Sequence, residues 1–290
     1  MKPSFVSGTF VLLLTLTASA CPVSARQCDR ACLAGFITDY LDAVVAEDPT
    51  AVALADEVRF TEDTVEMEVG QGLWATASGL RDYRQDILDV REGIAASQAV
   101  LEEAGSPVLL MLRLRVEDGR VTEIESVVTR SREEGILFNV DGVESADRTV
   151  MDYIPRASER LSRDEAIRIA EFYPAGLTIG SFVTVDAPFG PDAYRLENGG
   201  IMAGPGCSRP GCEDIKAQQI IGHPDLTTRV VAVDEEMGIV LLRMNFGDTG
   251  SYGPGNALIV WEAFKVYGGQ IHAVEAFMEI MPADAPTGWD

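Results

Sequence analysis

His272 and Glu68 are the residues of this sequence best suited to acid/base chemistry. The chain has only two histidines, and histidine is the side chain whose ordinary pKa lies near neutral pH. His272 shares a predicted strand face with apolar residues such as Val274 and Ala276, which suits either a satisfied core histidine or a general base in a cavity. His223, in a Gly-His-Pro sequence, is expected on a loop where it could contact a ligand.

Glu68 belongs to the acidic stretch VRFTEDTVEMEVGQGLW, residues 58–74. If this stretch is one strand, alternation places Glu62, Thr64, Glu66 and Glu68 on the same face, where solvent is their simplest environment. The alternative is that Glu68 enters the mouth of an apolar cavity, where burial raises the pKa of the carboxyl and makes it a useful general base. Trp74 could then form an apolar wall or simply be part of the core.

The phrase YRLENGG, residues 194–200, nearly repeats this acidic stretch. Arg195 and Glu197 correspond to Arg59 and Glu62, with one residue of slack. These arginines and Glu197 are candidate substrate-binding residues, as is Tyr40, whose hydroxyl could donate to a substrate oxygen. A pair that recurs within one chain is equally well explained by a structural Arg–Glu contact.

Further phrases recur in the same order, which indicates a duplicated unit. DILDVREGIAASQAVLEEAG resembles RVVAVDEEMGIVLLRMNFGDTG, and PVLLMLRLRVEDGRVTEIESVVTR resembles ALIVWEAFKVYGGQIHAVEAFMEIM. We therefore expect a signal peptide at 1–25, a first unit at 26–130, a linker at 131–160 and a second unit at 161–285.

Each unit is predicted to run from a helix through a short helix and a strand to an irregular insert and a meander of about four strands. Phe36, Tyr40, Leu41 and Val44 have helical spacing, and Ser162 with Glu165 forms a capping box for a helix that runs to Tyr173-Pro174. Asp118-Gly119 and Gly268-Gly269 predict tight hairpins. A helical layer on a curved antiparallel sheet is an α+β architecture.

This order of elements resembles the SnoaL-like, or nuclear transport factor 2-like, cone fold, so the chain is expected to hold two cone-shaped α+β barrels in tandem. The segments C-x3-C, YLDAVVAEDP, VRFTED, GQGLW, LSRDEAIRIAEFY and RLENGG are similar to an uncharacterised exported domain family of bacteria and fungi. The resemblance implies an apolar cavity with a few polar groups. It also implies that such cones often pair through their sheets, so a homodimer is one arrangement to expect.

The first 25 residues have the charge and apolar run of a secretory signal peptide, so the protein is expected to be periplasmic or secreted. Cleavage after Ala25 competes with lipid attachment at Cys21. The remaining cysteines are expected to form the local disulfides Cys28–Cys32 and Cys207–Cys212, although four cysteines allow three connectivities. Their spacing does not match common zinc modules, so no metal site is expected.

A formal net charge of −23 disfavours nucleic acid and anionic membranes as partners. No other stretch approaches the roughly 18 apolar residues that a membrane span requires. Nucleotide, nucleophile-elbow and zinc-protease motifs are absent from the sequence, so an enzyme of this type would use no cofactor. We expect a lyase, dehydratase or isomerase that acts on a small apolar oxygenated molecule. The alternative is an exported binding protein for an apolar ligand or a protein partner.

Overall fold

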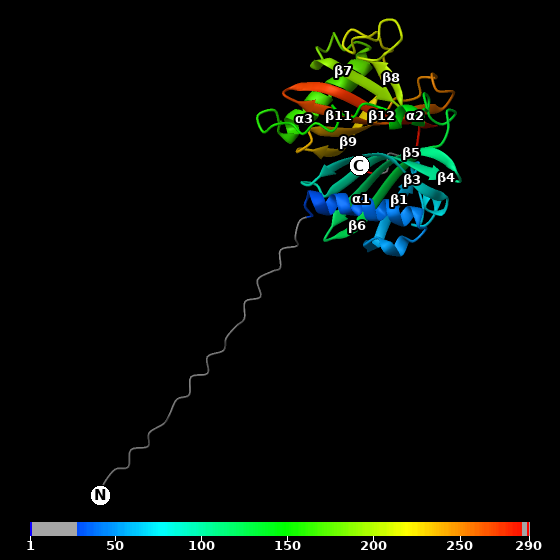
Figure 1. Ribbon diagram of the computed structural model, residues 1–290, viewed down its shortest axis with the longest axis vertical. Helices are drawn as coiled ribbons and strands as arrows, with labels where there is room; N and C mark the ends of the chain where they lie inside the picture. The colour runs from blue at the N-terminus through cyan, green and yellow to red at the C-terminus, as the bar shows by residue number, and fades with distance from the viewer. Residues whose placement is uncertain (2–27, 286–288, 290) are drawn as a thin grey trace.

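The computed structural model describes Met1, residues 28–285 and Trp289. It has a mixed α+β architecture in which two similar halves each contribute one six-stranded sheet. Figure 1 shows the halves stacked one above the other. The predicted signal peptide and Cys21 lie outside the described residues. No helix among the described residues is long and apolar enough to cross a membrane.

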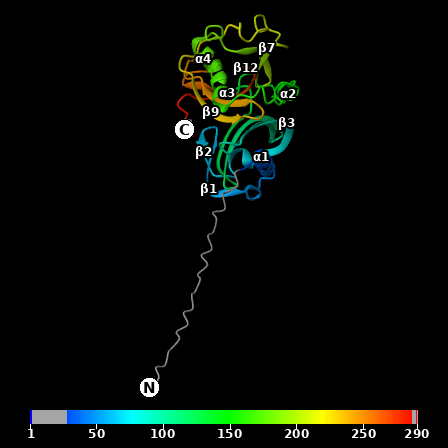
Figure 2. The same cartoon turned by 90° about the vertical axis from the view of Figure 1, so that its left-hand side faces the viewer.

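The first half follows the predicted element order. It consists of α1 (Arg30–Val45), η1 (Pro49–Ala51), β1 (Leu54–Glu62), β2 (Val65–Glu66), η2 (Gly72–Ala75), β3 (Ala77–Asp89), β4 (Ile94–Glu103), β5 (Ser106–Glu117) and β6 (Arg120–Thr129). The sheet order is β2-β1-β6-β5-β4-β3, with β1 and β6 parallel and the other neighbours antiparallel. In Figure 2, β3 arcs around α1.

The second half repeats this topology. After α2 (Val140–Glu144) come α3 (Arg163–Ala170), α4 (Phe172–Ile179), β7 (Phe189–Glu197), β8 (Gly200–Ala203), β9 (Thr227–Asp234), β10 (Ile239–Asn245), β11 (Asn256–Tyr267) and β12 (Gln270–Pro282). The sheet order β8-β7-β12-β11-β10-β9 matches the first sheet strand for strand. Both sheets run from edge to edge without closing, so the expected barrels are not formed.

Several local predictions are confirmed. Ser162 and Glu165 form the capping box of α3. Both hairpin turns have left-handed backbone at their two central positions, which Gly119 and Gly268-Gly269 accommodate without steric cost. The predicted end of the helix at Tyr173-Pro174 is wrong, because Pro174 lies in the first turn of α4, where an intrahelical N–H donor is not needed.

Three apolar clusters hold the molecule together. One packs α1 against the concave face of the first sheet, and another packs α3 and α4 against the second sheet. The third lies between the two sheets and includes Ile87, Met111, Trp261 and Phe277, all at most 3% exposed. The two sheets therefore contact each other face to face within one chain.

The segment between the halves is tied to the second sheet by Lys265. This side chain is fully buried, and its ammonium group donates to the carbonyl oxygens of Met151, Tyr153 and Met237 at 2.9, 2.5 and 2.6 Å. Because three backbone acceptors surround the charge, Lys265 fixes residues 151–153 against the β9–β10 turn.

Candidate functional site in the second half

A cavity of about 720 Å³ opens in the second half, between α4, the concave face of the sheet and the loop between β8 and β9. This volume suits a small organic ligand. Apolar side chains supply much of its wall, and a few polar groups converge on it. Its lining includes Tyr173, Leu177, Arg195, Glu197, Gln218, His223, Phe246, Leu258, Val260, Glu262 and Met278.

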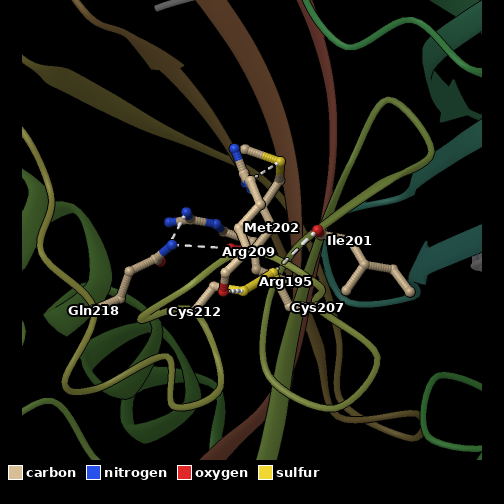
Figure 3. Close-up of a disulfide and its surroundings, with 7 residues drawn as sticks. All are labelled: Arg195, Ile201, Met202, Cys207, Arg209, Cys212 and Gln218. Atoms are coloured by element: carbon tan, nitrogen blue, oxygen red, sulfur yellow. Dashed lines mark hydrogen bonds between the residues drawn. A yellow bond between two sulfur atoms is a disulfide. The ribbon is translucent and has the colours of Figure 1, made fainter.

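Arg195 organises one end of the cavity. Its guanidinium donates to the Tyr173 hydroxyl at 3.1 Å and to the Gln218 amide oxygen at 2.9 Å, and it lies 3.0 Å from the Glu197 carboxylate. Figure 3 shows Arg195 beside Gln218, close to the Cys207–Cys212 disulfide. Arg195 is only 6% exposed, so this ion pair sits where electrostatic interactions are strong.

Glu262 is the most unusual group of the site. It is 2% exposed, and burial raises the pKa of its carboxyl to about 8, with a further increase from the negative charge of Glu197. Arg195 and a hydrogen bond with Tyr173 act in the opposite direction but do not offset burial. Its Oε2 atom has no hydrogen-bond partner among the described residues. At neutral pH Glu262 is therefore a carboxylic acid with a free oxygen at the cavity.

The strand registers place Glu262 and Glu197 in one row. Ala276 of β12 pairs with Glu262 on one side and with Glu197 on the other. In the first half the same row is Leu112, Ser126 and Glu62. The position of Glu262 is therefore occupied by leucine in the first half.

The register also explains the slack in the repeated phrase. Arg195 pairs with Val274, whereas Phe60 pairs with the matching Ile124, so Phe60 rather than Arg59 occupies the position of Arg195. Arg195 and Glu262 are thus features of the second half, since Phe60 and Leu112 occupy their positions in the first half.

In the first half, Trp74 and Tyr40 pack against each other in the core. Trp74 is 1% exposed, and its indole N–H donates to the Tyr40 hydroxyl at 3.1 Å with the rings edge to face. Trp74, predicted as an apolar wall, and Tyr40, predicted as a substrate donor, thus contact each other. Tyr40 and Trp74 both belong to the apolar cluster that packs α1 against the first sheet.

The structural Arg–Glu contact forms only in the second copy of the phrase, between Arg195 and Glu197, because Arg59 pairs with Glu66 instead. The last residue of the phrase, by contrast, has the same role in both copies. Asp63 accepts the backbone N–H of Val128 at 2.8 Å, and Asn198 accepts that of Met278 at 2.8 Å. Both residues have left-handed backbone, with φ of 51° and 43°. The phrase recurs because each copy ends the strand at a turn and ties that turn to the neighbouring strand.

The loop of residues 204–226 covers part of the cavity. The predicted disulfide Cys207–Cys212 is present, as is Cys28–Cys32 before α1. The Gly204 N–H also donates to the Cys212 carbonyl at 2.7 Å, and Gln218 bridges Arg195 and the Met202 carbonyl. These contacts fix the loop over the polar end of the cavity (Figure 3).

His223 contacts the cavity, in keeping with its predicted place on a loop. It is 7% exposed, and its ring meets Phe246 edge to face at 4.7 Å. Burial lowers the pKa of the imidazole, so His223 is neutral at pH 7. The structure thus brings Arg195, Glu197 and His223 together around one cavity.

His272 lies elsewhere. A bulge in the β11–β12 hairpin leaves it without a pairing partner on β11, and its ring stacks on Tyr267 at 3.7 Å while Nε2 lies 3.1 Å from the Tyr267 carbonyl oxygen. The bulge turns His272 out of the alternation that sequence reasoning assumed. It does not line the cavity.

Glu68 and Arg59 are also away from the cavity. The stretch 58–74 is not one strand, because Asp63 and Thr64 turn the chain back into β2. Glu62 is consequently buried and binds the Leu73 N–H at 2.8 Å, whereas Glu68 is exposed. Arg59 stacks on Trp289 at 4.2 Å and pairs with the exposed Glu66.

Comparison with known proteins adds family similarity but no activity. A protein-family model described as a domain of unknown function (DUF8021) matches residues 159–278, the range from just before α3 into β12. The second half is similar to that family. No curated protein matches the chain. Among the described residues, no group of three or more His, Cys, Asp or Glu side chains is arranged to hold a metal ion.

Proposed function

We propose that the second half is a SnoaL-like cone that catalyses a general acid/base reaction on a small, uncharged, oxygenated molecule. The reaction class is a lysis, dehydration or isomerisation without a cofactor. The observation that carries the proposal is Glu262, a protonated acid with a free oxygen at a ligand-sized cavity. A carboxylic acid kept neutral at pH 7 can donate its proton to a substrate oxygen.

Two carboxyl groups in one site can divide the work of acid and base when their environments differ. Glu197 pairs with the Arg195 guanidinium, whereas burial keeps Glu262 protonated. In a dehydration, Glu197 would take a proton from a carbon, and that C–H electron pair would form a C=C bond. The C–O bond would break as Glu262 protonates the departing hydroxyl, which leaves as water. Proton transfer from Glu197 to Glu262 would then restore the starting state.

The charges around Glu262 favour an uncharged reacting group on the substrate. The positive charge of Arg195 is matched by Glu197, and Glu262 carries no charge at neutral pH. The guanidinium already contacts Tyr173, Gln218 and Glu197, so we assign it to positioning rather than to direct capture of an anion.

The wider setting fits an exported protein. Both disulfides suit an oxidising compartment, as expected for a secreted or periplasmic chain. We propose that the first half is a structural support, because Trp74 and Tyr40 pack its interior. His272 and Glu68 have no part in this mechanism, since neither lines the cavity.

The test is mass spectrometry of a metabolite extract before and after incubation with a chain that starts at residue 26. The account expects a compound to be converted into a product that differs by water or has equal mass. Glu262→Gln should lower the rate at least 100-fold, because the amide cannot donate a carboxylic acid proton. Glu57→Gln, a change at an exposed carboxylate, is the matched control.

The alternative is a binding protein, which the disulfide-stapled loop over the cavity also suits. In that case a compound would co-purify with the protein and be recovered unchanged after long incubation. That result, together with no consumption of any compound, would replace the catalytic proposal.

A further inference from the structure

Like Glu262, His223 lines the cavity and has a buried atom without a hydrogen-bond partner, its Nδ1. The His223 backbone N–H donates to the carbonyl of Leu177 at 2.9 Å, which fixes the residue against α4. Its ring is buried against Phe246, and Nδ1 finds no hydrogen-bond partner among residues 28–285 or Trp289. A buried polar atom without a partner is costly, and at a cavity wall a ligand can satisfy it.

The positions of the two residues can be compared along β11, which carries Glu262 and against which His223 packs through Phe246. The Phe246 N–H donates to the Leu258 carbonyl at 3.0 Å, and the Phe246 ring contacts the ring of His223. Phe246 therefore places His223 near Leu258. Leu258 and Glu262 are four residues apart on the same face of the strand, which corresponds to about 13 Å at a rise of ~3.3 Å per residue. Glu262 and His223 therefore mark opposite ends of the cavity.

The side of the cavity formed by β11, β12 and α4 is apolar between these ends. Val260 lies between Leu258 and Glu262 on the same strand face, and Leu177 and Met278 line the cavity from α4 and β12. A ligand that spans the cavity must place hydrocarbon against this band. Polar groups in its middle would lose their hydration without a replacement.

We infer that the cavity binds an elongated, uncharged molecule with an oxygen group at each end and a hydrocarbon middle. One oxygen accepts a hydrogen bond from the Glu262 carboxyl group, and the other hydrogen-bonds with the imidazole of His223. The inference rests on the proposed function for the reacting end, at Glu262, and adds His223 as the residue that selects the far end. A molecule with only one oxygen leaves His223 unsatisfied and binds less tightly.

The experiment measures dissociation constants by calorimetry for 1,8-octanediol and 1-octanol, using the chain from residue 26. We expect the wild type to prefer the diol by about tenfold, the usual effect of leaving one buried polar group unpaired. His223→Phe should remove this preference without weakening the binding of 1-octanol. His223→Gln, which keeps a hydrogen-bonding group, should retain part of the preference.

An equal ratio of the two constants in the wild type and His223→Phe would overturn the inference, as would no binding of either probe. Circular dichroism of each variant checks that it is folded. The proposed function fails separately. A His223-dependent preference for the diol, with no compound consumed in the extract, would retain the two-ended ligand and reject the acid/base reaction.

Discussion

Asp89 and Asp234 hold the two halves together by a reciprocal exchange of hydrogen bonds. Asp89 accepts the backbone N–H of Val233 at 2.9 Å, and Asp234 accepts that of Leu88 at 3.0 Å. Both carboxylates are at most 1% exposed, and they occupy matching places at the ends of β9 and β3. The two copies of the duplicated unit are therefore paired about an approximate twofold relation.

Each aspartate also meets the arginine that opens the other half's first helix. Arg163 lies 2.7 Å from Asp89, and Arg30 lies 2.6 Å from Asp234. Asp89→Ala should therefore lower the free energy of unfolding by about 3 kcal/mol, since it leaves a buried N–H and an arginine without their acceptor. Urea unfolding followed by circular dichroism measures this loss.

The control for that variant is Asp56→Ala, whose carboxylate is fully exposed. It should change the unfolding free energy by less than about 0.5 kcal/mol. Equal stability of Asp89→Ala and the control would mean that the exchange contributes nothing to holding the halves together.

Asn198 and Asp63 are matched in position but not interchangeable. The Asn198 amide donates to the carbonyls of Ile136 and Met278, which a carboxylate cannot do. Asn198→Asp should therefore cost about 2 kcal/mol or more, because it places a carboxylate against two carbonyl oxygens. Thermal unfolding measures this loss of stability, with Asp192→Asn, a substitution at an exposed position of β7, as the control. A variant as stable as wild type would show that these donor contacts are not needed.

Much of the fold was predictable because the sequence contains two copies of the same unit. The capping box, the hairpin glycines, the local cysteine pairs and the order of repeated phrases are all local signals, and the structure confirms them. The site was harder, because burial depends on distant contacts. Glu262 stands alone in the strand sequence IVWEAFKVY, where a single glutamate ordinarily indicates a solvent-facing position.

A signal for Glu262 did exist in the repeat. Aligning the two long hairpins at Asp118-Gly119 and Gly268-Gly269 places Glu262 opposite Leu112. One copy therefore has an ionisable side chain where the other has an apolar core residue. The observed place of His272 differs from the expected alternation for another reason. A β-bulge breaks strand alternation, and the sequence around it does not mark where the extra residue lies.

We expect the buried Glu262 to lower the free energy of unfolding as the pH rises. Its pKa is about 8 in the folded protein against an ordinary 4.5, so between these pH values the folded state holds a proton that the unfolded chain has lost. Stability therefore falls as pH rises through this window, by up to about 1.4 kcal/mol per pH unit. Glu262→Leu, which copies the first half, should flatten this slope and be more stable than wild type at pH 8.

Denaturant unfolding at pH 5 and pH 8 compares the two proteins, with Glu57→Gln again as the surface control. The same loss of stability between these pH values in wild type and Glu262→Leu would contradict a buried, protonated Glu262.

The Cys207–Cys212 disulfide should matter more for the cavity than for overall stability. It closes a very short loop, so replacing both cysteines with serine should cost roughly 2 kcal/mol or less. The loop carries Gln218, which holds Arg195, so binding of 1-octanol should weaken several-fold. The matched control is the serine pair at Cys28 and Cys32, whose disulfide is remote from the cavity and should leave binding unchanged. Equal effects of the two pairs on binding would argue against a specific role for the loop.

The most direct test of the account is a pH titration of the Glu262 side chain. Carbon-13 NMR of protein labelled at the glutamate carboxyl groups, with Glu262→Gln used to assign the signal, measures its protonation. The account predicts a carboxylic acid at pH 7 that titrates near pH 8. A Glu262 signal that titrates below pH 5 would show a carboxylate at neutral pH, and Glu262 could not then be the acid of the proposed reaction.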